Sequence, residues 1–342
     1  MPAPSDATLW PAFSGLIPPP LKLLKDVIDW THEQVVAFQV APERLILIAC
    51  HQVFPTLLQA PLAGELAFLS AESRLLAHGA EPLLVQASLL EAGPCAGGGY
   101  VTADILDGLD RAAAGSTARL VATARARGAG HHGPWLVAVA IGTILKSRLK
   151  TGRDARAGDH LILTRPIGTN PALFSENRDG YARVVAGLSD RIGPWLATVP
   201  GVHAMLGIGE RSLLATGSDM AGSSEVTVNL EAARLPLATD LSHSAGGSPV
   251  WNRALNAVRR QNGKLPRPDE LTLPELLLRL NEVNGGLLVA VDPGVSEKVV
   301  AEIQRRSGTP FARVIGRISA PVQGGRQVVI HNRPPEGGAD DQ

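Results

Sequence analysis

Apolar residues recur at helical spacing in three segments of the first half of the chain, which predicts helices there. These helices are expected at residues 21–38, 62–78 and 102–114. Short, continuous apolar runs have the length of buried strands and are expected at residues 44–50, 82–90, 120–124 and 134–144. Gly79 follows the second helix and is expected to end it. Strands and helices in this order indicate an α/β unit with crossover connections.

A charged, turn-rich segment at residues 146–159 separates this half from a second one. The second half is expected to contain strands at residues 160–164, 224–230, 286–291 and 311–318. Helices are expected at 273–280 and 295–307, and helical or mixed structure at 181–188 and 202–206. We therefore predict an N-terminal extension, two domains and a tail, at residues 1–40, 41–148, 149–325 and 326–342.

The composition argues against several classes of protein. The 342 residues are 45% hydrophobic, which is enough to bury the cores of two domains. Lys and Arg number 32, as do Asp and Glu, so the chain lacks the surplus of cations that a nucleic-acid binder needs. No apolar stretch approaches the roughly 18 residues of a membrane span, and no signal peptide is visible. The two cysteines make no disulfide framework, which predicts a cytoplasmic protein.

Three passages carry a resemblance to a known superfamily. Gly79-Ala-Glu-Pro-Leu83 closes a helix and opens a strand, and residues 157–169 open the second half. Gly285-Gly-Leu-Leu-Val-Ala-Val-Asp-Pro293 is followed by Ala312-Arg-Val-Ile-Gly316. In this order the passages resemble the aminoimidazole-ribonucleotide (AIR) synthase-like superfamily. Its members include selenophosphate synthetase, thiamine-monophosphate kinase and the hydrogenase-maturation protein HypE.

The resemblance implies a two-domain fold, α/β plus α+β. The N-terminal domain would dimerise and form a β-barrel with its partner, and the C-terminal domain would be an α+β sandwich. It also implies that ATP lies in a groove near the dimer interface. Members of the superfamily use ATP and Mg²⁺ to phosphorylate an oxygen, selenium or amide substrate. Aspartates hold the metal, which suits the preference of Mg²⁺ for hard oxygen ligands.

The chain departs from this pattern at most of the acidic positions. The first core strand carries Ile48-Ala-Cys-His-Gln52, with no carboxylate, and residues 121–127 are basic where the superfamily has an acidic residue. Arg74 stands where the superfamily has an aspartate, and an arginine cannot ligate a cation. Asp219 is retained in Ser218-Asp-Met-Ala-Gly222, which matches an Asp-Val-Thr-Gly-like turn. The helix that follows this turn in the superfamily is expected to be missing, because a strand comes next.

Two hypotheses for the function remain open. In the first, the chain is a divergent ATP-dependent enzyme that activates a small molecule by phosphoryl transfer. Asp219 would hold Mg²⁺, and the residues that bind the nucleotide would be Arg74, Arg127, Thr164, Arg165, Gly168, Thr169, Asn170 and Gly222. In the second, which we favour, most of the Mg-ATP site is lost. The chain would then be a homodimeric, non-catalytic accessory or binding subunit for a nucleotide, another small molecule or a partner enzyme.

Other candidate residues have plainer interpretations. Cys50 lies in an apolar strand and is expected to be a buried, inert thiol, whereas Cys95 lies in a glycine-rich loop. His131 and His132 are adjacent in a loop, so their side chains point apart and a shared metal ion is not expected. Residues 16–25 lack the cysteine of the selenophosphate branch, which argues against that branch. Acidic residues displaced in sequence remain candidates for the metal position: Glu65, Glu72 and Asp104.

Overall fold

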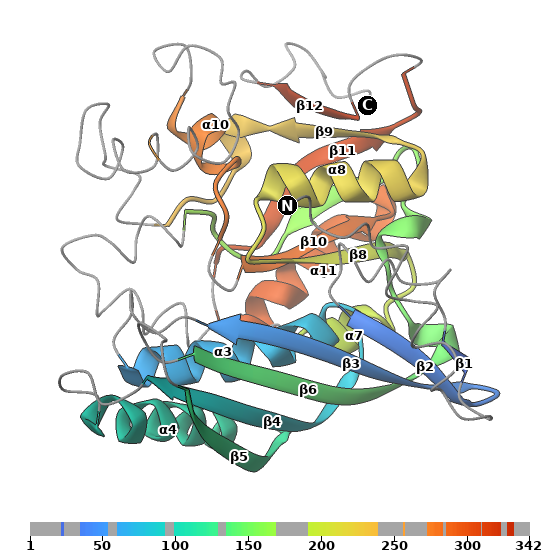
Figure 1. The fold of residues 1–342 in the computed structure, drawn as a ribbon. Helices are drawn as coiled ribbons and strands as arrows, with labels where there is room; N and C mark the ends of the chain where they lie inside the picture. Colours follow the sequence, from blue (N-terminus) through green and yellow to red (C-terminus); the bar gives the residue numbers. More distant parts are fainter. Residues whose placement is uncertain are drawn as a thin grey trace, which may run out of the picture.

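The structure is a computed structural model with two six-stranded sheets, one above the other in Figure 1. It describes residues 22–23, 35–53, 60–92, 99–128, 135–168, 191–238, 256, 272–282, 285–308, 310–322 and 327–331. Each sheet is mixed and packs against helices, so the described part of the chain is an α+β fold. No helix in these ranges is long and apolar enough to cross a membrane.

The N-terminal sheet has the strand order β1-β2-β3-β6-β4-β5. The strands are β1 Lys22–Leu23, β2 Val35–Ala41, β3 Arg44–Val53, β4 Glu81–Ala92, β5 Arg119–Gly128 and β6 Trp135–Leu145. Neighbours are antiparallel except β4 and β5, which are parallel. A parallel pair needs a crossover connection, and helix α4 (Gly99–Ala114) provides it.

Helix α3 (Ala60–Leu76) covers one face of this sheet, where it contacts β3, β4 and β6, and α4 packs against α3. The two helices approach closely at glycines. A Cβ at Gly64 would overlap the carbonyl oxygen of Ile105, and one at Gly108 would overlap that of Pro61. Glycine is therefore required at this helix–helix contact.

The opposite face of the N-terminal sheet is apolar and only partly covered. Burial alternates along β6: Leu136, Ala138 and Ala140 are fully buried, whereas Val137 and Ile141 are half-buried. The same alternation along β3 places Cys50 on the less buried face, where it is exposed. The prediction of a buried Cys50 is therefore wrong, because side chains alternate along a strand and the buried set is the other one.

The C-terminal sheet has the order β12-β9-β11-β7-β10-β8. Its strands are β7 His160–Leu163, β8 Val202–Gly209, β9 Thr227–Glu231, β10 Gly285–Val291, β11 Arg313–Ser319 and β12 Val328–His331. Its helices are α7 Gly193–Leu196, α8 Leu213–Ser224, α10 Leu273–Leu277 and α11 Pro293–Ser307, with short 3₁₀ turns η3 Lys146–Arg148, η4 Gly152–Asp154 and η5 Ala232–Arg234. Helix α8 packs against β8, β9 and β10, and α11 against β7 and β11. All seven residues of β10, which lies between β7 and the edge strand β8, are buried.

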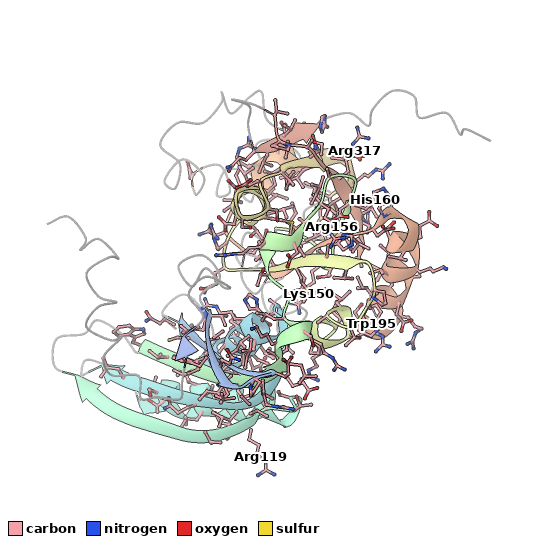
Figure 2. The ribbon with its side chains drawn as sticks, turned by 90° about the vertical axis from the view of Figure 1, so that its right-hand side faces the viewer. Arg119, Lys150, Arg156, His160, Trp195 and Arg317 are labelled. Carbon is pink, nitrogen blue, oxygen red and sulfur yellow. The ribbon has the colours of Figure 1, made fainter. Side chains whose placement is uncertain are left out.

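The two halves meet where the C-terminal end of α3 packs on β8. Gly79 ends α3 with a φ of 80°, as predicted. Lys150, which lies between the two sheets in Figure 2, donates to the carbonyl of Val202 at 2.7 Å. Gly207 lies against Ala77, and a Cβ there would come within 2.9 Å of the Ala77 side chain. The end of α3 and the end of β8 therefore lie side by side.

Most of the predicted elements are confirmed, but three assignments are wrong. Residues 35–38 were assigned to a helix at 21–38 and lie in strand β2, which pairs with β3. Residues 202–206 are strand, in β8. The segment 218–222 lies inside helix α8 and is not a turn, so the helix expected to be missing is present. Residues 181–188 lie outside the described residues.

The domain boundaries and the shared barrel remain predictions. Strand β2 runs across the boundary at residue 41, and β12 lies within the predicted tail and pairs with β9. The described strands of one chain form two open sheets.

Candidate functional site

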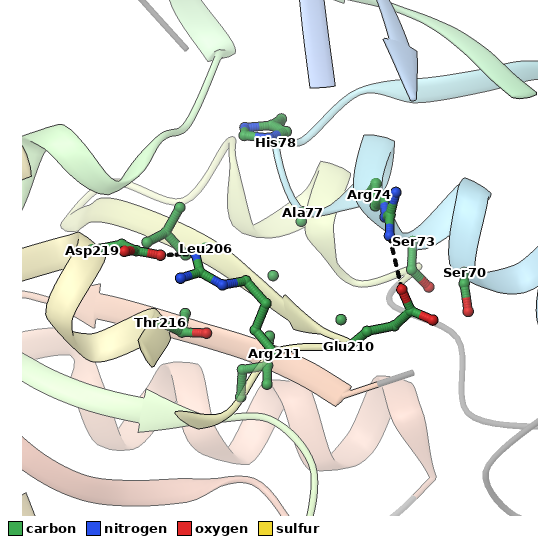
Figure 3. A pocket seen from close by; sticks show the side chains of 13 residues that line it. Ser70, Ser73, Arg74, Ala77, His78, Leu206, Glu210, Arg211, Thr216 and Asp219 are labelled. Atoms are coloured by element: carbon green, nitrogen blue, oxygen red, sulfur yellow. Dashed lines mark hydrogen bonds and ion pairs between the residues drawn. The ribbon is translucent and has the colours of Figure 1, made fainter. Parts of the chain in front are cut away.

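A pocket lies between the end of α3 and the turn that joins β8 to α8 (Figure 3). Helix α3 contributes Ser70, Ser73 and Arg74 to its wall, and the turn and α8 contribute polar side chains opposite. Ser70, Ser73, Arg74 and Ala77 fall on one face of α3, because residues three and four apart are neighbours on a helix. The end of β8, from Leu206 to Gly209, forms the remaining wall.

Arg74 connects three parts of this site. Its guanidinium donates to the backbone carbonyl of Cys50 through Nη1 and lies 3.2 Å from both His51 Nδ1 and Glu210 Oε2 through Nη2. Only 12% of the Arg74 side chain is exposed, compared with 45% of that of Glu210. This largely buried cation therefore ties strand β3 and helix α3 of one half to the turn after β8 in the other.

His51 acts as a neutral neighbour of this cation. Burial, together with the positive charge of Arg74, lowers the pKa of His51 to about 3. The imidazole is therefore neutral at physiological pH, and its Nδ1 can accept a hydrogen bond from Arg74. Burial also lowers the pKa of Arg74, but a guanidinium keeps its charge in proteins. The positive charge at this position consequently needs an anion, and Glu210 supplies it.

A second arginine–carboxylate pair lies on the other side of the pocket, where Arg211 Nη1 donates to Asp219 Oδ2. Ser212 caps α8 by accepting from the backbone N–H of Ala215 at 3.1 Å. The helix carries Asp219 two turns after this cap, facing back toward Arg211 (Figure 3). Both members of the pair are partly buried, with 30% and 21% of their side chains exposed.

The donor set does not fit a magnesium ion in the described part of the chain. Asp219, the predicted metal ligand, already accepts from a guanidinium, and a neighbouring cation opposes a second one. Among the described residues no three His, Cys, Asp or Glu side chains are grouped as a metal site would require. The displaced acids Glu65, Glu72 and Asp104 do not line the pocket: Glu65 pairs with Arg111, and Glu72 accepts from Ser116.

The predicted nucleotide-binding residues of the second half mostly lie apart from the pocket lining. Thr164 is buried after β7, and its Oγ1 accepts from the backbone N–H of Leu287 at 2.8 Å. Arg165 is also buried. Gly168 has a φ of 88° and donates its N–H to Glu282 Oε1 at 2.8 Å. Glu282 in turn donates its own N–H to the carbonyl of Arg211, which connects this loop to the turn after β8.

The remaining predicted site residues are exposed or lie wholly or partly outside the described set. Gly222 is an exposed residue near the end of α8. The backbone of Arg127 lies in β5, and its side chain is outside the described set. Thr169, Asn170, Cys95, His131 and His132 lie outside the described residues.

Sequence reasoning missed Glu210, Arg211 and His51 as members of the site. Glu210 is 136 residues from Arg74, so no local pattern connects them. Recognising residues 202–209 as a strand would have indicated these residues. Strand β8 ends at Gly209 and α8 begins at Leu213, so the strand-to-helix turn lies at 210–212 and not at 218–222.

Comparison with known proteins places this fold. No protein-family model matches the chain. Over 193 residues it is 32% identical to the selenide, water dikinase of Burkholderia orbicola (strain MC0-3), which covers 52% of each protein. The chain thus spans about half the length of the curated relatives it matches. These relatives carry the name of the branch that the missing cysteine argued against.

Solved structures match over most of the chain. Thiamine-monophosphate kinase from Stenotrophomonas maltophilia K279a has a TM-score of 0.63 at 18% identity, covering 86% of this chain and 88% of that one. HypE in complex with ATP gives 0.64 at 14%, with 90% of each chain covered. HypE in its complex with HypF gives 0.63 at 14%, with 90% and 94% covered. Relatives and neighbours are all AIR-synthase-like superfamily members, which confirms the resemblance predicted from the three sequence passages.

Proposed function

We propose that this protein is a non-catalytic member of the AIR-synthase-like fold that binds an anionic small molecule, such as a nucleotide, and serves a partner enzyme as an accessory subunit. The observation that carries the proposal is the position of the Arg74 guanidinium in the pocket wall. It stands where the superfamily places an aspartate, and its guanidinium is held by Cys50, His51 and Glu210 at the wall of the pocket.

The charges of the pocket support binding over metal-dependent chemistry. Each of its two carboxylates, Glu210 and Asp219, is paired with an arginine, so its negative charge is already compensated and the neighbouring cation opposes the binding of Mg²⁺. Arginine can instead bind phosphate or carboxylate oxygens directly through its planar fork. A nucleotide would therefore be held by guanidinium groups and hydroxyls without a bridging cation.

We also propose that the protein is a homodimer. The half-buried residues of β3 and β6, such as Ile46, Ile48 and Ile141, make the outer face of the N-terminal sheet apolar. A second copy packed on this face would cover it, as the barrel implied by the resemblance requires. The exposed, free thiol of Cys50 suits a reducing cytoplasm. The crystallised complex of HypE with HypF is a precedent for a protein partner within this fold.

The test combines turnover and binding. Calorimetric titration with ATP, in EDTA and in excess Mg²⁺, is expected to show equal affinity in both buffers. Incubation with ATP, Mg²⁺ and either selenide or thiamine monophosphate is expected to release no ADP or phosphate. Turnover of ATP in the presence of any small-molecule acceptor would contradict the proposal. Co-purification is expected to recover a partner enzyme, and a lone dimer in every pull-down would count against the accessory role.

An ATP-dependent enzyme is the second candidate function. Two observations favour it: the curated relatives are named selenide, water dikinase, and a structure with a TM-score of 0.64 was solved in complex with ATP. In this case Asp219 would have to leave Arg211 to serve a metal ion. The enzyme hypothesis predicts ATP hydrolysis with a small-molecule substrate that is lost in Asp219→Ala.

A further inference from the structure

We propose that Arg74 is the anchor of a metal-free oxyanion site in which Glu210 is a built-in substitute for the ligand. A phosphoryl group, either free phosphate or the terminal phosphate of a nucleotide, takes the place of the Glu210 carboxylate on the guanidinium. This rests on the proposed binding function and names the chemical group that the pocket recognises.

The two members of the Arg74–Glu210 pair differ in burial, which decides which one can move. Arg74 is 12% exposed and its other donor is fixed on the Cys50 carbonyl, whereas 45% of the Glu210 side chain already faces solvent. The turn that carries Glu210 is held by its backbone, because Arg211 N–H donates to the carbonyl of Ile208 at 2.8 Å. Rotation of the Glu210 side chain alone would uncover Arg74 and leave the carboxylate in water.

The cation cannot remain uncompensated when Glu210 leaves. His51 is neutral, and Cys50 offers its backbone carbonyl and a neighbouring thiol, so Glu210 is the one carboxylate in contact with the guanidinium among the described residues. Removing the partner of a largely buried charge such as Arg74 is costly, because the charge that remains is poorly solvated. Exchange of one anion for another avoids that cost. The site therefore selects anions.

The remaining polar groups on this wall favour a phosphoryl group over a simple carboxylate. Ser70 and Ser73 are buried on the same face of α3 as Arg74, and Figure 3 shows them beside the Arg74–Glu210 pair. A tetrahedral phosphoryl group offers three oxygens, which can accept from a guanidinium and from hydroxyls together. A carboxylate has only two, in one plane.

The experiment is calorimetric titration with inorganic phosphate in EDTA, for the wild-type chain and Glu210→Gln. Loss of the competing carboxylate is expected to tighten phosphate binding about tenfold. Glu302→Gln is the matched control, because Glu302 is also an arginine-paired glutamate but lies on α11, away from the pocket. Its phosphate affinity is expected to equal that of the wild type. Equal affinity in wild type and Glu210→Gln, or an equal gain in Glu302→Gln, would overturn the proposal.

A second variant connects the effect to Arg74. In Arg74→Gln/Glu210→Gln the gain is expected to disappear, and its persistence would overturn the role of Arg74. Thermal unfolding of each variant confirms that it is folded, and the comparison of Glu210→Gln with Glu302→Gln stands even if the double variant does not fold. Titration of Glu210→Gln with ADP separates the two sources. If the site takes a nucleotide, ADP binds more tightly than inorganic phosphate does. If the site takes free phosphate, inorganic phosphate binds at least as tightly as ADP. These titrations contain no metal ion and measure binding alone. Their failure is therefore distinguishable from failure of the proposed non-catalytic function, which is tested by the turnover of ATP.

Discussion

Glu72 is a buried carboxyl group whose replacement by glutamine is expected to stabilise the protein at neutral pH. The side chain is 1% exposed, on the face of α3 that packs against the turn after α4. Its Oε1 accepts from the Ser116 hydroxyl, and its Oε2 has no hydrogen-bond partner among the described residues. Burial raises the pKa of Glu72, while the Ser116 hydrogen bond and the charge of Arg191 oppose the rise.

The sign of the pH effect follows from the raised pKa. At pH values between the unfolded and folded pKa of Glu72, the folded protein binds more protons at this group than the unfolded protein does. The contribution of Glu72 to stability is therefore complete below the unfolded pKa. That contribution is lost as the pH rises through the folded pKa. An unsatisfied buried oxygen costs about 1–3 kcal/mol. We therefore expect Glu72→Gln to gain roughly 1 kcal/mol at pH 7.5 and little at pH 4.5, because the amide cannot ionise but also leaves one polar atom without a partner.

Urea unfolding at pH 3.0, 4.5, 6.0 and 7.5, followed by circular dichroism, measures this difference. The free energy of unfolding of Glu72→Gln relative to the wild type should increase with pH. Glu302→Gln is the control with the opposite sign, because two arginines lower the pKa of Glu302 to about 2. Its wild-type carboxylate contributes stability above the unfolded pKa that is lost as the pH falls toward 2. A stability difference for Glu72→Gln that is constant with pH, or negative at pH 7.5, would refute the argument.

Three further predictions concern packing, the second ion pair and the outer sheet face. Gly64→Ala should destabilise the protein by about 1–3 kcal/mol in thermal unfolding, because the added Cβ would overlap the Ile105 carbonyl. Gly217→Ala in α8 is the control: its Cβ would lie 3.4 Å from Val228, so this variant should be neutral or stabilising. Asp219→Asn should cost about 0–1 kcal/mol, because the Arg211 pair is partly exposed; a loss above 2 kcal/mol would mean that the pair holds the pocket together. In a Cys95→Ser background, the rate at which a maleimide labels Cys50 should fall as protein concentration rises, because the proposed dimer would cover the face on which Cys50 is exposed. A rate independent of concentration would contradict that interface.

The sequence pattern predicted correctly the elements that depend on neighbouring residues alone. The apolar run from Arg44 to Cys50 is strand, and Gly79 ends α3 in the left-handed conformation that a glycine allows. Residues 35–38 show the limit of this approach. Val35 and Val36 continue a helical spacing from residues 24–28, but pairing with β3 holds them in a strand, and β-branched residues favour that state.

The site was only partly predictable, because its members come from distant segments. Arg74 stood out as a basic residue at an acidic position, and it does line the pocket. Its partner Glu210 is brought there by the packing of α3 on β8, which no sequence window contains. Asp219 was predicted as a metal ligand; it lines the pocket, and its pairing with Arg211 depends on helix α8, which begins after Arg211 and carries Asp219.

The central claim is that arginine has taken over the role of the metal ion in this pocket, and titration with Mn²⁺ in place of Mg²⁺ tests it most directly. Electron paramagnetic resonance reports the free Mn²⁺ remaining when the protein is added to Mn²⁺ and ATP. The account predicts that the protein removes no more Mn²⁺ than ATP alone does. A stoichiometric loss of the free Mn²⁺ signal that Asp219→Ala restores would contradict it.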